Sequence, residues 1–333
     1  MSTGESLGWG VLGGTARITR RGFLPGLRAA RNGRLVAVGS RSRPHAAPAV
    51  TGEFVDQQQV VSYHEVLADR AVDAVYLALP NSMHHEWVMN ALAAGKHVLC
   101  EKPLTLTSRA AAEISRTAAG AGLVVMEAFM YRFHPQYARV PWERMLEPIG
   151  ELVAAEVHFS EPMTVAGDIR EDRSLGGGAL WDIGCYCLDL MCWRFGEAIA
   201  VHAFGTERNG CNWSGSVQIR FAAGQLVTCW WSFHGPQWQR ATLVGDRGIV
   251  TLYDPFRPGD RTTTMVEVAG SKTPVIAVGD DCFRREIEHF GDVVRGRTTS
   301  AVPLTESERW IRLAERIDRC LLETAQPGPT TSS

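Results

Sequence analysis

Short apolar runs alternate with helix-like stretches through the first 128 residues, and this alternation limits the fold more than any other feature of the chain. The apolar runs lie at residues 10–12, 35–38, 72–79, 98–100 and 123–126, with helical patterns at 83–94 and 108–121. Strands that alternate with helices in this way form a parallel sheet. We therefore predict an α/β Rossmann domain, with a doubly wound parallel sheet, over residues 1–128.

Glycines follow the first of these runs and predict a tight turn into a helix. Gly13-Gly14-Thr15-Ala16 stands between residues 10–12 and a segment typical of a helix start. Such a turn lets backbone N–H groups approach a pyrophosphate at a helix N-terminus. Gly8-x-Gly10-x-x-Gly13 also matches the dinucleotide motif, but that register would place strand residues inside the turn. The alternative is a strand–helix turn that binds nothing.

The end of the second run indicates which nicotinamide cofactor the domain prefers. A carboxylate there accepts the ribose 2′-hydroxyl of NAD, whereas an arginine accommodates the 2′-phosphate of NADP. The chain has Gly39-Ser40-Arg41-Ser42-Arg43 and no acidic residue at this place. This pattern favours NADP(H), the alternative being that both arginines are only solvated loop charges.

Glu101-Lys102-Pro103 follows residues 98–100, at the strand end where an open parallel sheet binds ligands. A lysine there can hold a hydroxyl, polarise a carbonyl or lower the pKa of a neighbouring acid. Pro103 biases Lys102 towards an extended conformation, so the side chain has a defined direction. The alternative is an exposed Glu-Lys pair in a turn.

Two histidines follow the polar pair Pro80-Asn81 that closes the run at residues 72–79. Neighbouring residues of a helix point to different sides, so a shared metal ion is not expected. We expect one of His84 and His85 to face the cofactor loop and the other to lie at the surface.

The pattern changes in residues 129–324 and predicts a second, α+β domain. Strand-like runs at residues 152–159, 215–221, 226–233, 239–244 and 248–252 have no helices between them, which is typical of an antiparallel sheet. Amphipathic helices are expected at residues 282–294 and 306–322, and the tail at 325–333 is expected to be disordered. Trp230, Trp231 and Phe233 would cover either a subunit contact or an internal face beneath helices.

A glycine-rich stretch in this half carries candidate catalytic side chains. Three glycines at residues 176–178 predict a closely approached backbone at a helix start. Asp182 and Tyr186 are four residues apart and would share a helix face. A tyrosine can exchange a proton with an alcohol or alkoxide when a cation, for which Lys102 is the candidate, lowers its pKa. The alternative, which the spacing alone favours, is a structural tyrosine beside a capping aspartate.

The composition argues against several classes of function. The net charge of −2 provides no attraction to nucleic acid or to an anionic membrane. No apolar run reaches the length of a membrane span, and residues 1–9 lack the apolar core of a signal peptide. The eight cysteines are scattered without metal-site spacing, so we expect free thiols, no metal ion and a cytoplasmic protein.

Through residues 10–18, 94–103 and 176–186, the chain resembles the glucose–fructose oxidoreductase/inositol dehydrogenase/MocA (Gfo/Idh/MocA) family over residues 7–322. Glu101-Lys102-Pro103 preceded by Ala-Gly-Lys-His-Val-Leu is the most specific part of the likeness. The resemblance implies a Rossmann domain followed by a domain with an open, mostly antiparallel sheet. That second domain would supply the substrate pocket and the contact of a homodimer or homotetramer.

The resemblance also implies roles for single residues. Lys102 matches the lysine that reaches the substrate oxygen and the nicotinamide, and Asp182 matches the aspartate that orients the substrate. Tyr186 is similar to the tyrosine of a subgroup with nucleotide-sugar 3-ketoreductases, NADP-dependent xylose dehydrogenases and dihydrodiol dehydrogenases. Asp168 and Arg170 are expected to line the pocket. Glu127 stands where several ketoreductases have asparagine, which favours the aldose or diol dehydrogenases.

The implied site is defined residue by residue. Substrate contacts are expected from Lys102, Glu127, Asp168, Arg170, Asp182 and Tyr186, with Lys102, Tyr186 and Asp182 as the catalytic residues. Cofactor contacts are expected from Gly13, Gly14, Thr15, Ala16, Arg17, Ile18, Ser40, Arg41, Leu79, Pro80, Asn81, His84, Glu101 and Lys102. The turn at Gly13-Gly14 is one residue longer than in relatives, so no phosphate contact is assigned to a single residue.

These observations predict an NADP(H)-dependent oxidoreductase. It would transfer a hydride between the nicotinamide and a carbinol or keto carbon of a sugar or nucleotide-sugar, such as a 3-keto-deoxysugar. The alternatives are an NADP-dependent aldose 1-dehydrogenase or diol dehydrogenase, and a non-catalytic NADP-binding sensor. A nucleic-acid-binding module is disfavoured by the balanced charge.

Overall fold

A computed structural model describes residues 6–40, 60–138, 145–164, 167–324 and 326–327. The chain forms two compact units. The first contains Met1–Thr105, Arg109–Phe133 and Asp281–Thr305, and the second contains Leu106–Ser108, His134–Asp280 and Glu306–Ser333. The sequence prediction assigned all of residues 129–324 to the second domain, whereas residues 281–305 return to the first unit.

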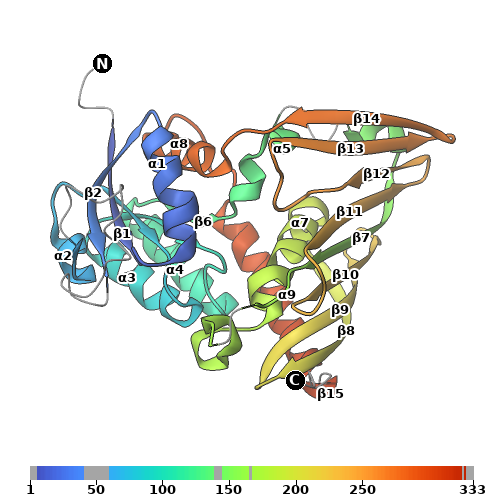
Figure 1. Cartoon of the computed structure of the whole chain (residues 1–333), viewed down its shortest axis with the longest axis horizontal. Helices are drawn as coiled ribbons and strands as arrows, with labels where there is room; N and C mark the ends of the chain where they lie inside the picture. Colours follow the sequence, from blue (N-terminus) through green and yellow to red (C-terminus); the bar gives the residue numbers. More distant parts are fainter. Residues whose placement is uncertain (1–5, 41–59, 139–144, 165–166, 325, 328–333) are drawn as a thin grey trace. The chain divides into compact units, whose positions relative to one another are not determined.

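The first unit is built on a six-stranded parallel sheet in the order β3-β2-β1-β4-β5-β6. Strands β1, β2 and β6 of this sheet are labelled in Figure 1. The strands are β1 Leu7–Leu12, β2 Gly33–Gly39, β3 Val60–Val61, β4 Ala74–Leu77, β5 His97–Glu101 and β6 Val125–Ala128. The helical segments are η1 Thr19–Phe23, α1 Leu24–Ala29, α2 Tyr63–Ala68, η3 Asn81–Met83, α3 His84–Ala93, α4 Ser108–Ala121, η4 Met130–Phe133 and α8 Cys282–Val294. This topology confirms the predicted Rossmann sheet.

Aromatic packing fixes the first helical segment to this sheet. Every residue of β1 and of β4 is buried, as expected for parallel strands covered on both faces. Trp9 of β1 packs against Phe23 and Phe290, with ring centroids 5.3 and 5.1 Å apart. Phe23 also stacks on Tyr76 of β4 at 3.8 Å. The segment that follows the glycine turn is therefore attached to the two central strands.

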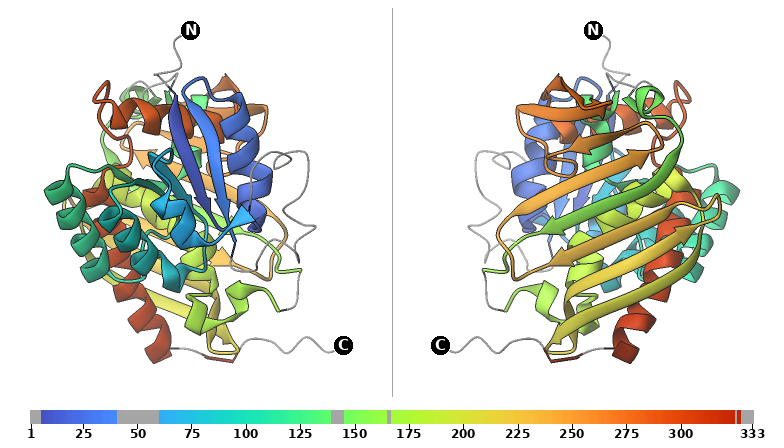
Figure 2. Two further views of the ribbon diagram at one scale, coloured as in Figure 1. Left: turned by 90° about the vertical axis from the view of Figure 1, so that its left-hand side faces the viewer. Right: turned by 90° about the vertical axis from the view of Figure 1, so that its right-hand side faces the viewer.

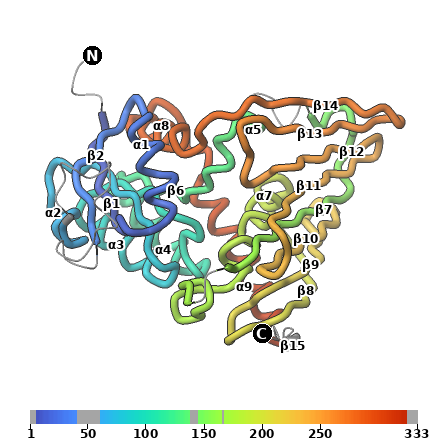
Figure 3. The backbone as a smooth tube through the Cα atoms, in the orientation of Figure 1, coloured from blue at the N-terminus to red at the C-terminus, as the bar shows by residue number. Residues whose placement is uncertain are grey.

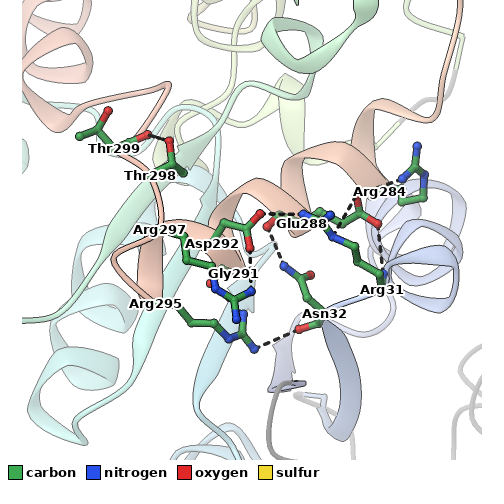
Figure 4. Close-up of polar contacts among 10 residues, drawn as sticks. All are labelled: Arg31, Asn32, Arg284, Glu288, Gly291, Asp292, Arg295, Arg297, Thr298 and Thr299. Carbon is green, nitrogen blue, oxygen red and sulfur yellow. Dashed lines mark hydrogen bonds and ion pairs between the residues drawn. The ribbon is translucent and has the colours of Figure 1, made fainter. Parts of the chain in front are cut away.

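Helix α8 joins the first unit through polar contacts that its position in the sequence does not reveal (Figure 4). Nη2 of Arg31 lies 2.7 Å from Oδ2 of Asp292. The side-chain amide of Asn32 donates to the carbonyl of Glu288 at 2.8 Å, across 256 residues of sequence. Ile287 of the same helix is fully buried. Because these partners are so distant in sequence, a local pattern cannot assign the helix to its unit.

The contact between η1 and α8 predicts that a methyl group at Gly22 destabilises the first unit. A Cβ at Gly22 would lie 2.4 Å from the ring of Phe283. Gly22→Ala should therefore lower the free energy of unfolding by about 1–3 kcal/mol in chemical denaturation, although alanine favours helices. Gly120→Ala in α4 is the matched control, since a Cβ there meets no atom within 4 Å. Equal stability of the two variants would contradict the close packing.

The second unit is built on a nine-stranded sheet in the order β14-β13-β12-β11-β7-β10-β9-β8-β15 (Figure 3). The strands are β7 Leu152–Ser160, β8 Ala198–Arg208, β9 Cys211–Phe221, β10 Leu226–Ser232, β11 Trp238–Gly245, β12 Gly248–Leu252, β13 Arg261–Val268, β14 Ser271–Val278 and β15 Gln326–Pro327. The helical segments are α5 Pro135–Ala138, η5 Glu147–Ile149, η6 Ile169–Glu171, η7 Arg173–Leu175, η8 Leu180–Gly184, α7 Cys185–Phe195 and α9 Leu304–Thr324. Neighbouring strands are antiparallel except for β7–β10 and β8–β15, which confirms the predicted mostly antiparallel sheet.

The two faces of this sheet differ. Helices α7 and α9 lie behind it in the right-hand view of Figure 2, and no helix of the described residues covers the face towards the viewer. Trp231 of β10 is fully buried on the helix side, where a Cβ on Gly184 of η8 would lie 2.9 Å from its ring. The neighbouring Trp230 is on the opposite side, and its ring stacks with His158 at 5.0 Å. Trp231 therefore belongs to the internal face, and Trp230 to the uncovered one.

Four strands of the second unit were not predicted from the sequence: β8, β13, β14 and β15, the last of which lies in the tail that was expected to be disordered. β14 is one edge of the sheet, and only Ala277 of its side chains is buried. An edge strand with few buried side chains has no apolar alternation to detect, and Pro274 within it weakens the strand signal further.

The remaining sequence expectations can be compared with the described residues. All eight cysteines are free thiols, as predicted. None of the described helices is long and apolar enough to span a membrane. In the tail, Gln326–Pro327 pairs with β8, while the disorder predicted for 325 and 328–333 concerns residues outside the described ranges. Within the described residues, no group of three or more His, Cys, Asp or Glu side chains could hold a metal ion.

Candidate active site

The turn after β1 lies at Gly13-Gly14, in the predicted register, while Gly8 and Gly10 lie inside the strand. Gly13 has a φ of 103°, and a Cβ there would lie 2.2 Å from the carbonyl oxygen of Ala78. Only glycine fits such a position. Oγ1 of Thr19 donates to the carbonyl of Gly13 at 2.9 Å, so the first turn of the helix holds the glycine turn in place.

The other predicted cofactor residues come from the ends of neighbouring strands. Ser40, after β2, is buried, and its N–H donates to the carbonyl of Val61 at 3.0 Å. Arg41 lies outside the described residues. Thr15, Arg17 and Ile18 are exposed; Ala16, Pro80 and Asn81 are half-buried; Leu79 is buried. Because β1, β2, β4 and β5 are parallel, their carboxyl ends lie at the same edge of the sheet, which is the edge at which ligands bind.

Three buried side chains hold the backbone around Lys102. Oε2 of Glu101 accepts from the N–H of Lys102 at 3.3 Å. Nδ1 of His84 lies 2.7 Å from the carbonyl oxygen of Pro103. Oε1 of Glu127 accepts from the N–H of Leu104 at 2.7 Å. We call residues 102–104 the lysine turn. Side chains from β5, α3 and β6 therefore hold successive backbone groups of this turn.

Two further buried side chains, Tyr76 and Glu286, interact with Glu101. The hydroxyl of Tyr76 donates to Oε1 of Glu101 at 2.6 Å. Glu286 of α8 is fully buried; burial and the charge of Glu101 raise the pKa of Glu286 well above its usual value. Of these two buried carboxyl groups, that of Glu101 is the one that accepts from the lysine turn. Sequence reasoning missed Tyr76 and Glu286, because only the tertiary contacts bring them to Glu101.

Two residues of the lysine turn's support were predicted to contact ligands directly. His84 is fully buried, and its Nε2 lies 2.9 Å from the carbonyl oxygen of Leu79, so both ring nitrogens already face backbone oxygens. Glu127 is also fully buried. Both side chains support the backbone of the lysine turn, and their predicted contacts with cofactor and substrate stay predictions. His85 is half-buried beside Glu113, so the two histidines have different surroundings, as expected for neighbouring residues of a helix.

In the second unit, Arg170 joins two of the predicted substrate residues. Its guanidinium lies 2.9 Å from Oδ1 of Asp168 and 3.2 Å from Oδ2 of Asp182. A Cβ at Gly177 would lie 2.5 Å from the carbonyl oxygen of Arg170, so the glycine-rich stretch lets η6 approach η8. The hydrogen bonds from Arg170 lower the pKa of Asp168 and outweigh its partial burial. Arg170 therefore holds the carboxylate of Asp182 through an ion pair, while it also pairs with Asp168.

Tyr186 is the second residue of α7, and its ring is packed among aromatic side chains. The ring centroid lies 5.5 Å from that of Phe159 and 5.6 Å from that of Phe256. Arg257 forms an ion pair with Glu161, and its guanidinium carbon lies 5.3 Å from the ring centroid of Phe159. Arg257 and the predicted proton donor Tyr186 thus both lie against the ring of Phe159. No sequence pattern singled out Arg257, since it lies in a loop after β12.

The pair of Arg170 and Asp168 predicts a pH-dependent contribution to stability. Because the folded-state pKa of Asp168 is lowered, the carboxylate stabilises the fold above its usual pKa of 3.8 and loses this effect as the pH falls through the lowered value. The difference in Tm between wild type and Asp168→Asn should therefore be largest near neutral pH and shrink below pH 3.8. A difference that stays constant down to pH 2.5 would contradict the assignment.

Comparison with known proteins adds to this geometry. Residues 7–129 match an oxidoreductase family with an NAD-binding Rossmann fold, and residues 147–251 match the GFO/IDH/MocA C-terminal domain. The chain is 31% identical to D-xylose 1-dehydrogenase (NADP(+)) 2 from Haloferax volcanii, over 96% of this chain and 98% of that protein. It is 32% identical to dTDP-3,4-didehydro-2,6-dideoxy-alpha-D-glucose 3-reductase from Streptomyces violaceoruber, over 85% and 84%.

Solved structures agree with the sequence relatives. A 3-ketoreductase from Actinomadura kijaniata, in complex with NADP and TDP-benzene, matches with a TM-score of 0.88 at 27% identity and covers 97% of this chain and 100% of its own. Both units are thus similar to the matched domains, and the resemblance extends over nearly the whole chain. The full-length identity and the two matched domains show that the chain belongs to the Gfo/Idh/MocA family of oxidoreductases.

Proposed function

We propose that the protein is an NADP(H)-dependent oxidoreductase that interconverts a carbinol and a keto carbon of a sugar or nucleotide-sugar. The observation that carries the proposal is the lysine turn, which fixes Lys102 at the ligand-binding edge of a parallel sheet. Three buried side chains from different elements hold the backbone that carries this lysine, which favours an enzyme over a structural or interaction protein.

The first unit fits the nicotinamide cofactor on its own geometry. The approach of Gly13 to Ala78 leaves a turn without side-chain bulk before a helix, where backbone N–H groups favour a pyrophosphate. Ser40 and Arg41 would hold the 2′-phosphate that distinguishes NADP from NAD. The bound nicotinamide supplies or accepts the hydride.

The remaining chemistry is assigned to three side chains. Lys102 stabilises the negative charge that develops on the substrate oxygen, a preorganised electrostatic role. Tyr186 exchanges the proton with the same oxygen. Asp182, held by Arg170, orients the substrate hydroxyls.

Two substrate classes are supported by different relatives. Similarity to the dTDP-keto-deoxysugar 3-reductase and to the 3-ketoreductase structure supports reduction of a 3-keto nucleotide-sugar. Similarity to the D-xylose 1-dehydrogenase supports oxidation of a free aldose. Similarity to a trans-1,2-dihydrobenzene-1,2-diol dehydrogenase supports oxidation of a diol in the same direction. We place the keto-sugar first because several relatives carry that name.

We propose a homodimer or homotetramer formed through the second unit's sheet. The sheet face without a helix carries Trp238, which is 43% exposed, and Phe204, which is 68% exposed. Burial of such side chains against a second copy would stabilise an assembly. Light scattering of wild type and Phe204→Glu tests this; a monomeric wild type would contradict it.

The test of the proposed function has two steps. Fluorescence titration should give tighter binding of NADPH than of NADH, and Arg41→Ala should weaken NADPH binding about 10-fold without affecting NADH. NADPH oxidation is then followed with 3-keto nucleotide-sugars, and NADP reduction with aldoses and diols. Tight NADPH binding without turnover of any of these substrates would support the non-catalytic sensor instead.

A further inference from the structure

The lysine turn is connected to a second loop through one side chain. His84 begins α3, and its ring lies between the carbonyl oxygens of Pro103, at 2.7 Å from Nδ1, and of Leu79, at 2.9 Å from Nε2. Pro103 follows Lys102, and Leu79 belongs to the loop after β4. The ring is fully buried, so water cannot replace either contact.

The chemistry of the imidazole makes this arrangement unusual. Both neighbours are acceptors, whereas a neutral imidazole has a single N–H to donate. A protonated ring would donate to both, but burial lowers the pKa of His84 and outweighs the two carbonyls, while the charge of Lys102 lowers it further. At neutral pH the ring therefore donates to only one of the two carbonyl oxygens at a time, depending on its tautomer. An apolar side chain at this position would leave both buried carbonyl oxygens without a donor, which is costly.

We propose that His84 is a positioning residue that couples the cofactor loop at Leu79 to the placement of Lys102. The proposal rests on the proposed function, because it assigns Leu79 to the cofactor and Lys102 to the substrate oxygen. A shift of the Leu79 loop on cofactor binding moves the ring, and the ring moves the carbonyl of Pro103 in the lysine turn. The ammonium group of Lys102 thereby reaches its place beside the substrate oxygen when the cofactor is bound.

Two isosteric variants separate the two contacts. The amide nitrogen of asparagine reaches the position of Nδ1, so His84→Asn keeps a donor to Pro103 and loses the contact with Leu79. The amide nitrogen of glutamine reaches the position of Nε2, so His84→Gln keeps the contact with Leu79 and loses that with Pro103. A single lost hydrogen bond changes an equilibrium by a factor of about 2–10.

The expected kinetics of the two variants therefore differ. His84→Asn should raise KM for NADPH about 5-fold with kcat nearly unchanged, and His84→Gln should lower kcat about 5-fold with KM nearly unchanged. His85→Gln, one residue along the same helix and half-buried beside Glu113, is the matched control and should change neither constant. Equal changes of kcat and KM in both His84 variants would overturn the proposal in favour of a purely structural role.

A second measurement does not depend on turnover. Lys96, Lys102 and Lys272 are the three lysines of the chain, so carbon-13 labelling at lysine Cε gives a spectrum in which each can be assigned. Addition of NADPH to the wild type should shift the Lys102 signal, and His84→Gln should reduce that shift while Lys272 stays unchanged. An NADPH-induced shift of Lys102 that is identical in wild type and His84→Gln would overturn the coupling, even if NADPH turnover had been demonstrated.

The spectra also separate failure of this inference from failure of the proposed function. If the protein turns over no substrate but shows the His84-dependent shift of the Lys102 signal, the coupling is supported and the proposed reaction is wrong. A protein that oxidises NADPH but shows no dependence on His84 retains the reaction and loses the coupling.

Discussion

Replacing Lys102 with alanine should lower kcat by about 10²- to 10³-fold and leave the Kd for NADPH within about 3-fold. The expected loss is large because the ammonium group is the proposed stabiliser of charge on the substrate oxygen. The fold should survive, because Glu101, His84 and Glu127 hold backbone groups of the lysine turn, and these contacts do not need the Lys102 side chain. Steady-state kinetics and a fluorescence titration of NADPH measure the two quantities.

Lys272→Ala is the control for removal of a lysine. Lys272 lies in β14, is 63% exposed and pairs with Glu267 at 3.2 Å. Exposed pairs of this kind contribute little to stability, so kcat, Kd and Tm should all stay near their wild-type values. Unchanged turnover of Lys102→Ala would remove Lys102 from the reaction, and a matching fall in Tm would show that the loss of activity is unfolding.

Tyr186→Phe should lower kcat by about 10- to 10²-fold, a smaller loss than that of Lys102→Ala. The substitution removes the hydroxyl but retains the ring, which packs against Phe159 and Phe256. Lys102 and water can then supply the proton less efficiently. The variant should keep its Tm and its Kd for NADPH, and the loss should appear in kcat with the preferred sugar substrate.

A second tyrosine provides the comparison. Tyr253 follows β12 and is 39% exposed, so Tyr253→Phe removes a hydroxyl that the proposed mechanism does not use. Its kcat should equal that of the wild type. A loss in Tyr186→Phe as large as in Lys102→Ala would make the tyrosine the obligatory acid, whereas no loss would exclude it from proton transfer.

The predictions from sequence were accurate where the signal is local. The glycine turn was placed at Gly13 and not at Gly8 or Gly10, because strand residues cannot occupy a turn, and the structure has that register. The helix at residues 108–121 has the predicted bounds, and so does α8 at 282–294. These features depend on apolar periodicity and on the steric freedom of glycine, which are properties of neighbouring residues.

The support of the candidate site was not predictable in the same way. Tyr76, Glu286 and Arg257 lie in segments whose patterns indicate only a strand, a helix and a loop. His84 and Glu127 were predicted to contact ligands, yet both are buried against the lysine turn. Their partners are distant in sequence or belong to other elements, so residue type and spacing do not reveal which polar groups they satisfy.

The sequence by itself determined that the chain begins with a parallel α/β sheet, that a glycine turn follows its first strand, and that Lys102 stands at a strand end. Periodicity and backbone sterics act within a few residues, which is why they can be read along the chain. Only the tertiary structure decided that α8 returns to the first unit and that His84 holds two loops. Those outcomes depend on burial, which favours partners for buried donors and acceptors, and these partners come from residues that the sequence order keeps apart.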